Sequence, residues 1–297
     1  MTPRRLLLLL PLLVLAGCGR LDQLPYSPAT TPAQWCEERP CIEVGGTTIN
    51  EPIGIVLVFA LALFWVGAGI YFLATRRGQR SRLWFGIALV LGGIGAGLAG
   101  TSYQLFSYVL KCQGRDVCVL TNGFEVGYSV TQAWSVSAMV IAVAYACTLG
   151  RARTALIVYA LVNALLYCVV AVVGIMAPSA IALSFSVLML FALPGVIIVI
   201  AITARRLRSP KERAIFTAAV LLLLVQVAYY AYWASGLTKT LWDGGNGVYF
   251  SENDVLHIGF ILWLAYLLWR VGPTLDDRET DAVGTTPDAP GIGQSRA

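Results

Sequence analysis

The single histidine of the chain stands beside acidic residues at the start of an apolar run. His257 follows Glu252, Asn253 and Asp254, and the apolar residues continue to Val271. On a helix, residues three and four positions apart share a face, so Asn253, Asp254 and His257 can converge. A carboxylate that orients the imidazole would make His257 a base or a metal ligand. The alternative is structural: Asn253 or Asp254 caps the helix, and His257 is a hydrogen-bonded packing residue.

A second set of polar residues shares one face of an expected helix. Its members are Glu125, Tyr128, Ser129, Gln132 and Ser135. At about 1.5 Å per residue, this stripe would run roughly 15 Å along the helix. Polar side chains are costly against lipid, so the stripe predicts a functional cavity, and hydrogen bonding between helices is the alternative. Ser102 lies in another polar stretch, Thr101 to Gln104, near the end of a neighbouring apolar run.

Helices that cross a membrane must position these residues. The 297-residue chain is 58% hydrophobic and 12% charged, roughly half the charge fraction of a soluble protein. Its apolar runs reach the length of about 20 residues that crosses a bilayer. The expected spans are residues 53–73, 83–110, 125–148, 154–176, 179–204, 214–237 and 253–271. We therefore predict an all-α, polytopic membrane protein with a seven-helix transmembrane domain over residues 53–272.

Residues 1–17 have the features of a secretory signal peptide. Arg4 and Arg5 precede an apolar run, Leu6 to Leu15, that is too short to span a membrane. The sequence LAGC, which ends at Cys18, resembles a bacterial lipobox, and this implies cleavage before Cys18 and lipidation of its thiol. The lipidated N-terminus would lie at the outer face of the bacterial cytoplasmic (inner) membrane. An ordinary signal peptide or an uncleaved anchor is the alternative.

Charge in the loops predicts the orientation of the spans. The loops after spans one, three and five hold eleven Lys and Arg, against three in the other inter-helix loops. Positive loops stay in the cytoplasm, so the N-terminus is expected outside and the C-terminus inside. The net charge of +5 then reflects loop positions and does not indicate a nucleic-acid partner. Residues 18–52 are expected to form a loosely ordered outer segment, and residues 273–297 a disordered cytoplasmic tail.

Four cysteines fall on the predicted outer side. Cys36 and Cys41 are close in sequence, and Cys112 and Cys118 flank a short loop. An oxidising compartment favours local disulfides, so we predict two of them, with free thiols as the alternative. The two cysteines within spans are expected to be small packing residues.

The sequence QWCEERPCIEVGGTTINEPIG, just before the first span, resembles the segment that opens the alkaline ceramidases. These enzymes belong to a seven-helix membrane hydrolase superfamily that includes the progestin and adiponectin receptor-like proteins. In ceramidases this acidic segment binds calcium, and the resemblance assigns that role to Trp35, Glu37 and Glu51. The family topology, seven helices with an outer N-terminus, agrees with the spans predicted here.

The resemblance also implies a zinc site at the ends of spans two, three and seven. The family has a Ser and a His near the end of span two, an Asp at the start of span three and a His-x3-His that opens span seven. Ser102, Glu125 and His257 correspond to one residue at each place, whereas Asn253 replaces a histidine and span two has none. A catalytic zinc takes three protein ligands and a water, so a metal here would need His257, Asp254 and Glu125. Such an oxygen-rich set is less selective for zinc.

Three functions are compatible with these patterns. The missing histidines favour a non-catalytic relative that binds a membrane lipid or a protein partner through an outward-facing polar cavity. The first alternative is a metal-dependent hydrolase of lipid amides or esters, in which a metal-bound water attacks a carbonyl. The second alternative is a transporter or channel component, although several spans hold almost no ionisable residues and no internal repeat is visible.

Overall fold

The computed structural model describes residues 19–243 and 247–278, and seven of its helices are long and apolar enough to cross a membrane. These helices are α3 (Pro52–Ala74), α4 (Arg80–Ala99, extended by η1, Gly100–Leu105), α6 (Gly123–Cys147), α7 (Gly150–Met176), α8 (Phe185–Ala204), α9 (Pro210–Ser235) and α11 (Glu252–Tyr266, extended by η3, Leu267–Val271). The predicted helical class and the seven membrane-length segments are confirmed. The predicted signal peptide, Cys18 and residues 279–297 lie outside the described residues.

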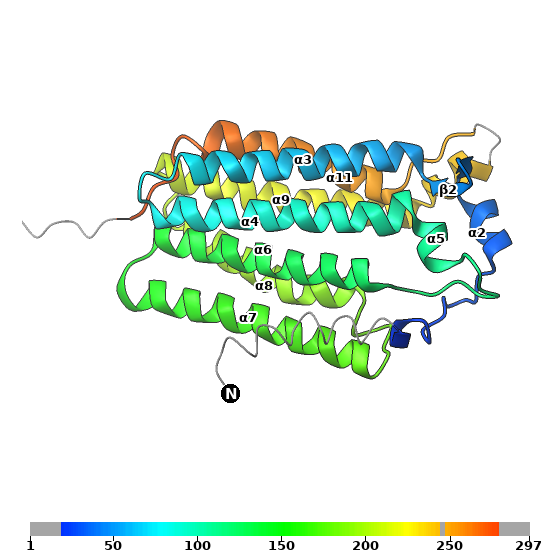
Figure 1. Ribbon diagram of the computed structural model, residues 1–297. Helices are drawn as coiled ribbons and strands as arrows, with labels where there is room; N and C mark the ends of the chain where they lie inside the picture. The colour runs from blue at the N-terminus through cyan, green and yellow to red at the C-terminus, as the bar shows by residue number, and fades with distance from the viewer. Residues whose placement is uncertain (1–18, 244–246, 279–297) are drawn as a thin grey trace, which may run out of the picture.

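Six of the seven long helices form a closed ring. Around the ring, α3 packs on α4, α4 on α6, α6 on α8, α8 on α9, α9 on α11, and α11 returns to α3. The seventh helix, α7, lies outside the ring against α6 and α8, at the lower edge of the bundle in Figure 1. Most of its apolar side chains are exposed, as expected for a helix surrounded by lipid. The first and last spanning helices are therefore neighbours.

Glycines let α4 approach the helices on either side of it. A Cβ on Gly93 would lie 2.8 Å from the carbonyl oxygen of Ala62 in α3, and one on Gly95 would lie 2.7 Å from Nε2 of Gln132 in α6. Gly69 of α3 and Gly86 of α4 face each other in the same way. Small residues at such positions are the usual means by which membrane helices pack closely. The glycine-rich sequence of α4 thus explains its place between α3 and α6.

The predicted second span is not one continuous α-helix. After α4, the backbone forms the π-helical turn η1, changes direction at Phe106 and continues as the short helix α5 (Ser107–Lys111). Inserted π-turns alter which way side chains point and are frequent at functional sites. The η1 turn carries Ser102, Tyr103 and Gln104, all of which contribute to the site described below.

Residues 19–51 fold as a cap over one end of the bundle, at the right of Figure 1. The cap contains α2 (Pro32–Glu38), which begins with a capping box between Thr31 and Gln34, and the hairpin β1 (Cys41–Val44) and β2 (Thr47–Asn50). The short helix α10 (Leu237–Leu241) lies in the chain between α9 and α11. We call the end of the bundle that the cap covers the cap end. The expectation of a loosely ordered segment was wrong, because disulfides and buried aromatic residues hold these residues in place.

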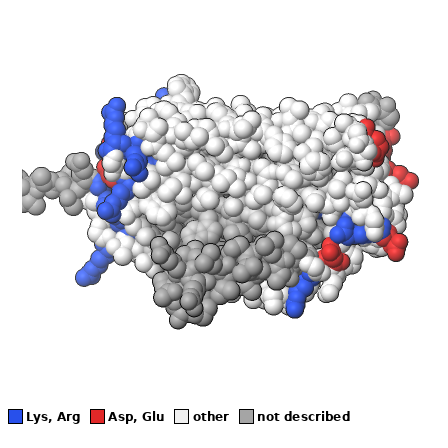
Figure 2. Space-filling view, in the orientation of Figure 1, with Lys and Arg blue, Asp and Glu red and all other residues white. Residues whose placement is uncertain are grey.

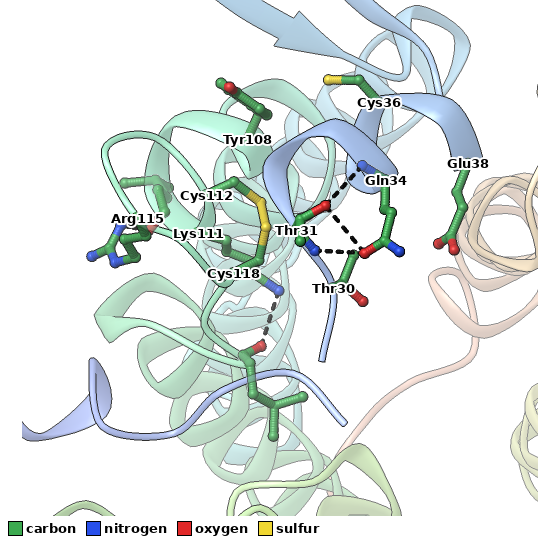
Figure 3. Close-up of a disulfide and its surroundings, with 12 residues drawn as sticks. Thr30, Thr31, Gln34, Cys36, Glu38, Tyr108, Lys111, Cys112, Arg115 and Cys118 are labelled. Carbon is green, nitrogen blue, oxygen red and sulfur yellow. Dashed lines mark hydrogen bonds between the residues drawn. A yellow bond between two sulfur atoms is a disulfide. The ribbon is translucent and has the colours of Figure 1, made fainter. Parts of the chain in front are cut away.

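Both predicted disulfides are present. Cys36 bonds to Cys41, which ties α2 to β1, and Cys112 bonds to Cys118 beyond α5. The second disulfide is fully buried and packs against Trp35 of α2; Figure 3 shows it next to Lys111, with α2 alongside. The cap is thereby attached to the loop between α5 and α6.

The opposite end of the bundle is basic. Figure 2 shows most of the visible Lys and Arg gathered there, whereas most of the visible Asp and Glu lie at the cap end, together with a few Lys and Arg. Residues 273–278, expected to belong to a disordered tail, instead pack across this basic end. Leu275 is buried, and the Asp277 carboxylate accepts hydrogen bonds from the backbone N–H groups of Arg80 and Ser81, at the start of α4. A carboxylate is favourable at a helix N-terminus, which explains why this short polar segment is held.

Candidate functional site

A cavity of about 380 Å³ lies inside the ring of helices. Its polar lining comes from the cap end, where α3 and α11 begin, and includes Arg39, Glu51, Tyr249, Glu252 and His257. Farther along the same helices the lining is apolar, with Trp65, Phe260 and Trp263 among its side chains. We call the polar part the mouth of the cavity. The arrangement gives one space a charged mouth and a largely apolar interior, whose lining also includes Gln132, Ser135 and Gln226.

His257 lies at this mouth as the sequence predicted, but without the expected acidic partner. Its side chain is 7% exposed and lines the cavity, and its Nδ1 atom has no hydrogen-bond partner among the described residues. Gln104, from the η1 turn, is 2% exposed, and its Oε1 atom is also unpartnered. Buried polar atoms normally have partners. Both atoms are enclosed in the wall of the cavity and are not exposed to it.

Asp254 performs the structural role that was the alternative for this region. One carboxylate oxygen, Oδ2, accepts hydrogen bonds from the backbone N–H (2.7 Å) and the hydroxyl (3.1 Å) of Ser251, which forms a capping box at the start of α11. The other oxygen, Oδ1, is buried without a partner and lies behind the cavity wall near Gly54 of α3. Asp254 therefore caps the helix that carries His257 and does not itself line the cavity.

Glu51 shares this side of the mouth. It precedes α3 with a left-handed backbone (φ 44°), an uncommon conformation for a residue with a side chain. Burial raises the pKa of its carboxyl to about 8, Arg39 opposes this effect, and the nearby carboxyls of Asp254 and Glu252 raise the pKa further. Burial likewise raises the pKa of the Tyr249 hydroxyl. Glu51 is therefore a buried, proton-holding group at the entrance of the cavity.

Glu125 and Ser102 come together as the sequence suggested, around an unforeseen lysine. The Lys111 ammonium lies 2.6 Å from Oε1 of Glu125, and both side chains are almost fully buried. The Ser102 hydroxyl donates to the same oxygen at 2.8 Å, and Asn122 Nδ2 donates to the Ser102 hydroxyl at 2.7 Å. Lys111 also donates to the carbonyl of Leu120. The ion pair is thus enclosed by hydrogen bonds, as a stable buried pair requires.

The polar stripe on α6 proves to serve both purposes that were considered for it. Tyr128, Gln132 and Ser135 line the cavity. Gln132 and Ser135 also donate hydrogen bonds to the carbonyls of Gly92 (3.1 Å) and Ala88 (2.8 Å) in α4. Glu125, the first member of the stripe, lies outside the cavity lining. The stripe therefore marks the cavity wall, but its carboxylate belongs to the neighbouring ion pair.

The metal site expected from the sequence is not assembled. Within residues 19–243 and 247–278, no three His, Cys, Asp or Glu side chains lie close enough together to hold a metal ion. Of the proposed ligands, His257 faces the cavity, Asp254 caps α11, and Glu125 is bound by Lys111. These side chains do not fit a three-ligand zinc site, and no catalytic step through a metal follows from them.

The residues expected to bind calcium have different surroundings from one another. Trp35 is buried, and the Arg39 guanidinium stacks on its ring at 3.9 Å from the ring centroid. Glu37 is exposed on α2, with its backbone carbonyl bonded to Trp242. Glu51 is buried at the mouth of the cavity. Calcium binding at these positions stays a prediction.

Sequence reasoning missed three contributors to the site. Lys111 was counted only as a loop charge, although a lysine at the end of an apolar run and an unmatched Glu125 could have suggested the pair. Arg39 and Tyr249 come from irregular segments, where no periodic pattern indicates which way a side chain points.

Comparison with known proteins gives no further guide: the chain matches no protein-family model, and neither curated proteins nor solved structures show a significant match.

Proposed function

We propose that the protein is a membrane protein that binds a lipid-like amphiphile in the cavity, in a non-catalytic binding or receptor-like role. The observation that carries this proposal is the cavity itself, with a polar mouth and a largely apolar interior. Its volume of about 380 Å³ falls within the range of small-molecule sites. An amphiphile would place its head group at the polar mouth and its chain in the interior.

The hydrolase alternative has less support. It needs three metal ligands around a water, and the described residues do not bring three together. Ser102 and Glu125 are engaged by Asn122 and Lys111, so neither is free to act on a substrate. The relationship to ceramidase-like hydrolases stays a prediction.

We infer that the cap end faces the outside of the bacterial cytoplasmic membrane. The basic residues at the opposite end support this orientation, and so do the two disulfides at the cap end, since disulfides persist in oxidising compartments. Lipidation of Cys18 would anchor the cap to the same side.

The binding proposal is tested with two alanines of α8. Ala192 lines the cavity, whereas Ala201 is exposed on the outside of the same helix. Ala192→Phe places a ring in the cavity, and Ala201→Phe places the same ring against the surrounding lipid. We expect native mass spectrometry of the purified protein to show a co-purified amphiphile on the wild type and on Ala201→Phe, and its loss from Ala192→Phe. Wild-type protein without any bound amphiphile, and unable to take one up, would refute the proposal.

A further inference from the structure

The balance of charge at the mouth indicates what kind of head group the cavity takes, an inference that rests on the proposed function. Among the described residues that line the cavity, two carboxylates, Glu51 and Glu252, face one cation, Arg39. The carboxyl of Asp254 is close to that of Glu51, since a Cβ on Gly54 would lie 3.2 Å from Oδ1 of Asp254 and 3.5 Å from Oε2 of Glu51. Carboxyl groups therefore outnumber cationic groups at a largely buried surface.

Among the described residues, no cation of the cap end forms an ion pair with these carboxyl groups. Lys111 is paired with Glu125, and Arg115 with Asp22. Arg39 stacks on Trp35, and its one ion-pair contact among the described residues is with Glu38, at 4.0 Å. None of the ion pairs in the described part of the chain includes a carboxylate of the mouth. Unpaired buried carboxylates are costly, and a cation from outside the chain would remove that cost.

Hydrogen bonding at the mouth favours the same kind of head group. Carboxylates such as those of Glu51 and Glu252, which line the mouth, offer only hydrogen-bond acceptors when ionised. An ammonium group supplies only donors, whereas a carboxylate or phosphate head group supplies only acceptors. Tyr103 and Tyr249 add aromatic rings to the same lining, and aromatic faces attract cations.

We propose that the amphiphile bound in this cavity carries a cationic amine or ammonium head group, held at the mouth by Glu51 and Glu252, with its hydrocarbon chain in the apolar interior. The charged groups around Glu51 are Arg39, Glu252 and Asp254, with the Tyr249 hydroxyl beside them. In the empty cavity these surroundings favour a protonated Glu51. A bound cation reverses that preference, so binding at neutral pH releases a proton.

Three bromine-tipped probes with the same undecyl chain test this proposal. Their head groups are primary ammonium, alcohol and carboxylate. Bromine quenches tryptophan fluorescence, and Trp65 and Trp263 line the interior where the chain would lie. We expect saturable quenching in the wild type, with the ammonium probe binding at least about tenfold more tightly than the carboxylate probe, a difference of about 1.4 kcal/mol.

Substitutions at the mouth test whether its carboxyl groups cause the preference for the ammonium probe. Glu252→Gln and Glu51→Gln should each reduce the ratio of ammonium to carboxylate affinity several-fold, and Glu37→Gln, on the exposed side of α2, should leave it unchanged. Loss of saturable quenching in Ala192→Phe, but not in Ala201→Phe, identifies the cavity as the binding site.

The outcomes separate the two proposals. Equal affinity for all three probes, or tighter binding of the carboxylate, would overturn the cationic head group and leave amphiphile binding intact. Absence of saturable quenching by every probe would overturn both.

Discussion

At the scale of single residues, the pair of Lys111 and Glu125 is the most deeply buried ion pair among the described residues. Lys111 is 2% and Glu125 5% exposed, and the lysine ammonium lies 5.7, 5.8 and 4.9 Å from the ring centroids of Tyr26, Trp35 and Tyr103. Burying such a pair costs desolvation energy that only complete pairing offsets. Removing one partner should therefore lower the free energy of unfolding more than removing both.

The pair can be tested with a double-mutant cycle. We expect Lys111→Met or Glu125→Gln alone to lower the free energy of unfolding by about 3–5 kcal/mol, because each leaves a buried charge unpaired. The double variant should recover much of this loss. Thermal unfolding of the purified protein measures the effect, and additive single-variant losses would show that the two side chains do not interact.

Glu51 should give the stability of the protein a distinctive dependence on pH. Below pH 4.5, its ordinary pKa, the carboxyl is protonated in both the folded and the unfolded chain. Between pH 4.5 and about 8 the folded chain keeps this proton and the unfolded chain loses it. The folded state then binds more protons, so stability falls as pH rises through this interval, by up to about 1.4 kcal/mol per pH unit.

The measurement is the unfolding temperature of wild type and Glu51→Gln between pH 5 and pH 9. The neutral glutamine cannot lose a proton, so the unfolding temperature of the variant should fall less than that of the wild type as pH rises. Glu37→Gln serves as a control with an exposed carboxylate. Parallel curves for wild type and Glu51→Gln would contradict a proton held on Glu51.

At the scale of elements, close packing of α3 on α4 depends on specific glycines. A Cβ on Gly93 would meet backbone atoms of α3, with the Ala62 carbonyl oxygen at 2.8 Å and the Val66 nitrogen at 2.9 Å. A Cβ on Gly97, one turn further along α4, would meet nothing within 4 Å. The same substitution should therefore have opposite effects at the two positions.

We expect Gly93→Ala to destabilise the protein by about 1–3 kcal/mol, because backbone atoms cannot yield to the added methyl group. Gly97→Ala should stabilise it by roughly 0.5–1 kcal/mol, since alanine loses less conformational freedom in a helix. Unfolding temperatures of the two variants provide the comparison. A Gly93→Ala protein as stable as the wild type would show that α3 and α4 are not in close contact here.

Helical periodicity predicted the elements better than their ends. The α6 stripe correctly placed Tyr128, Gln132 and Ser135 on the cavity wall, because a regular helix fixes which residues share a face. The η1 turn broke that regularity after Gly100, so the side of Ser102 and Gln104 could not be read from spacing. Composition also failed for Leu275, which is buried in the main hydrophobic core with helix side chains far away in the sequence.

At the scale of the whole molecule, the separation of charge between the two ends predicts a fixed orientation in the membrane. Thr240, at the cap end, and Arg77, at the basic end, are both exposed. With Cys147 and Cys168, the free cysteines among the described residues, replaced by alanine, we expect a membrane-impermeant maleimide to label Thr240→Cys in intact cells. Arg77→Cys should react only after the cells are permeabilised, and the reverse pattern would invert the proposed orientation.

The closed ring also has a consequence for biosynthesis. The wall between α3 and α9 is completed by α11, and Trp65 of α3 packs against Phe260 and Trp263 of α11. Of the spanning helices that the structure describes, α11 is the last to leave the ribosome. Until that helix is inserted, the growing chain has a lateral gap through which surrounding lipid reaches the unfinished interior. A molecule from the bilayer could thus be enclosed during synthesis, before the finished protein ever meets a ligand from outside.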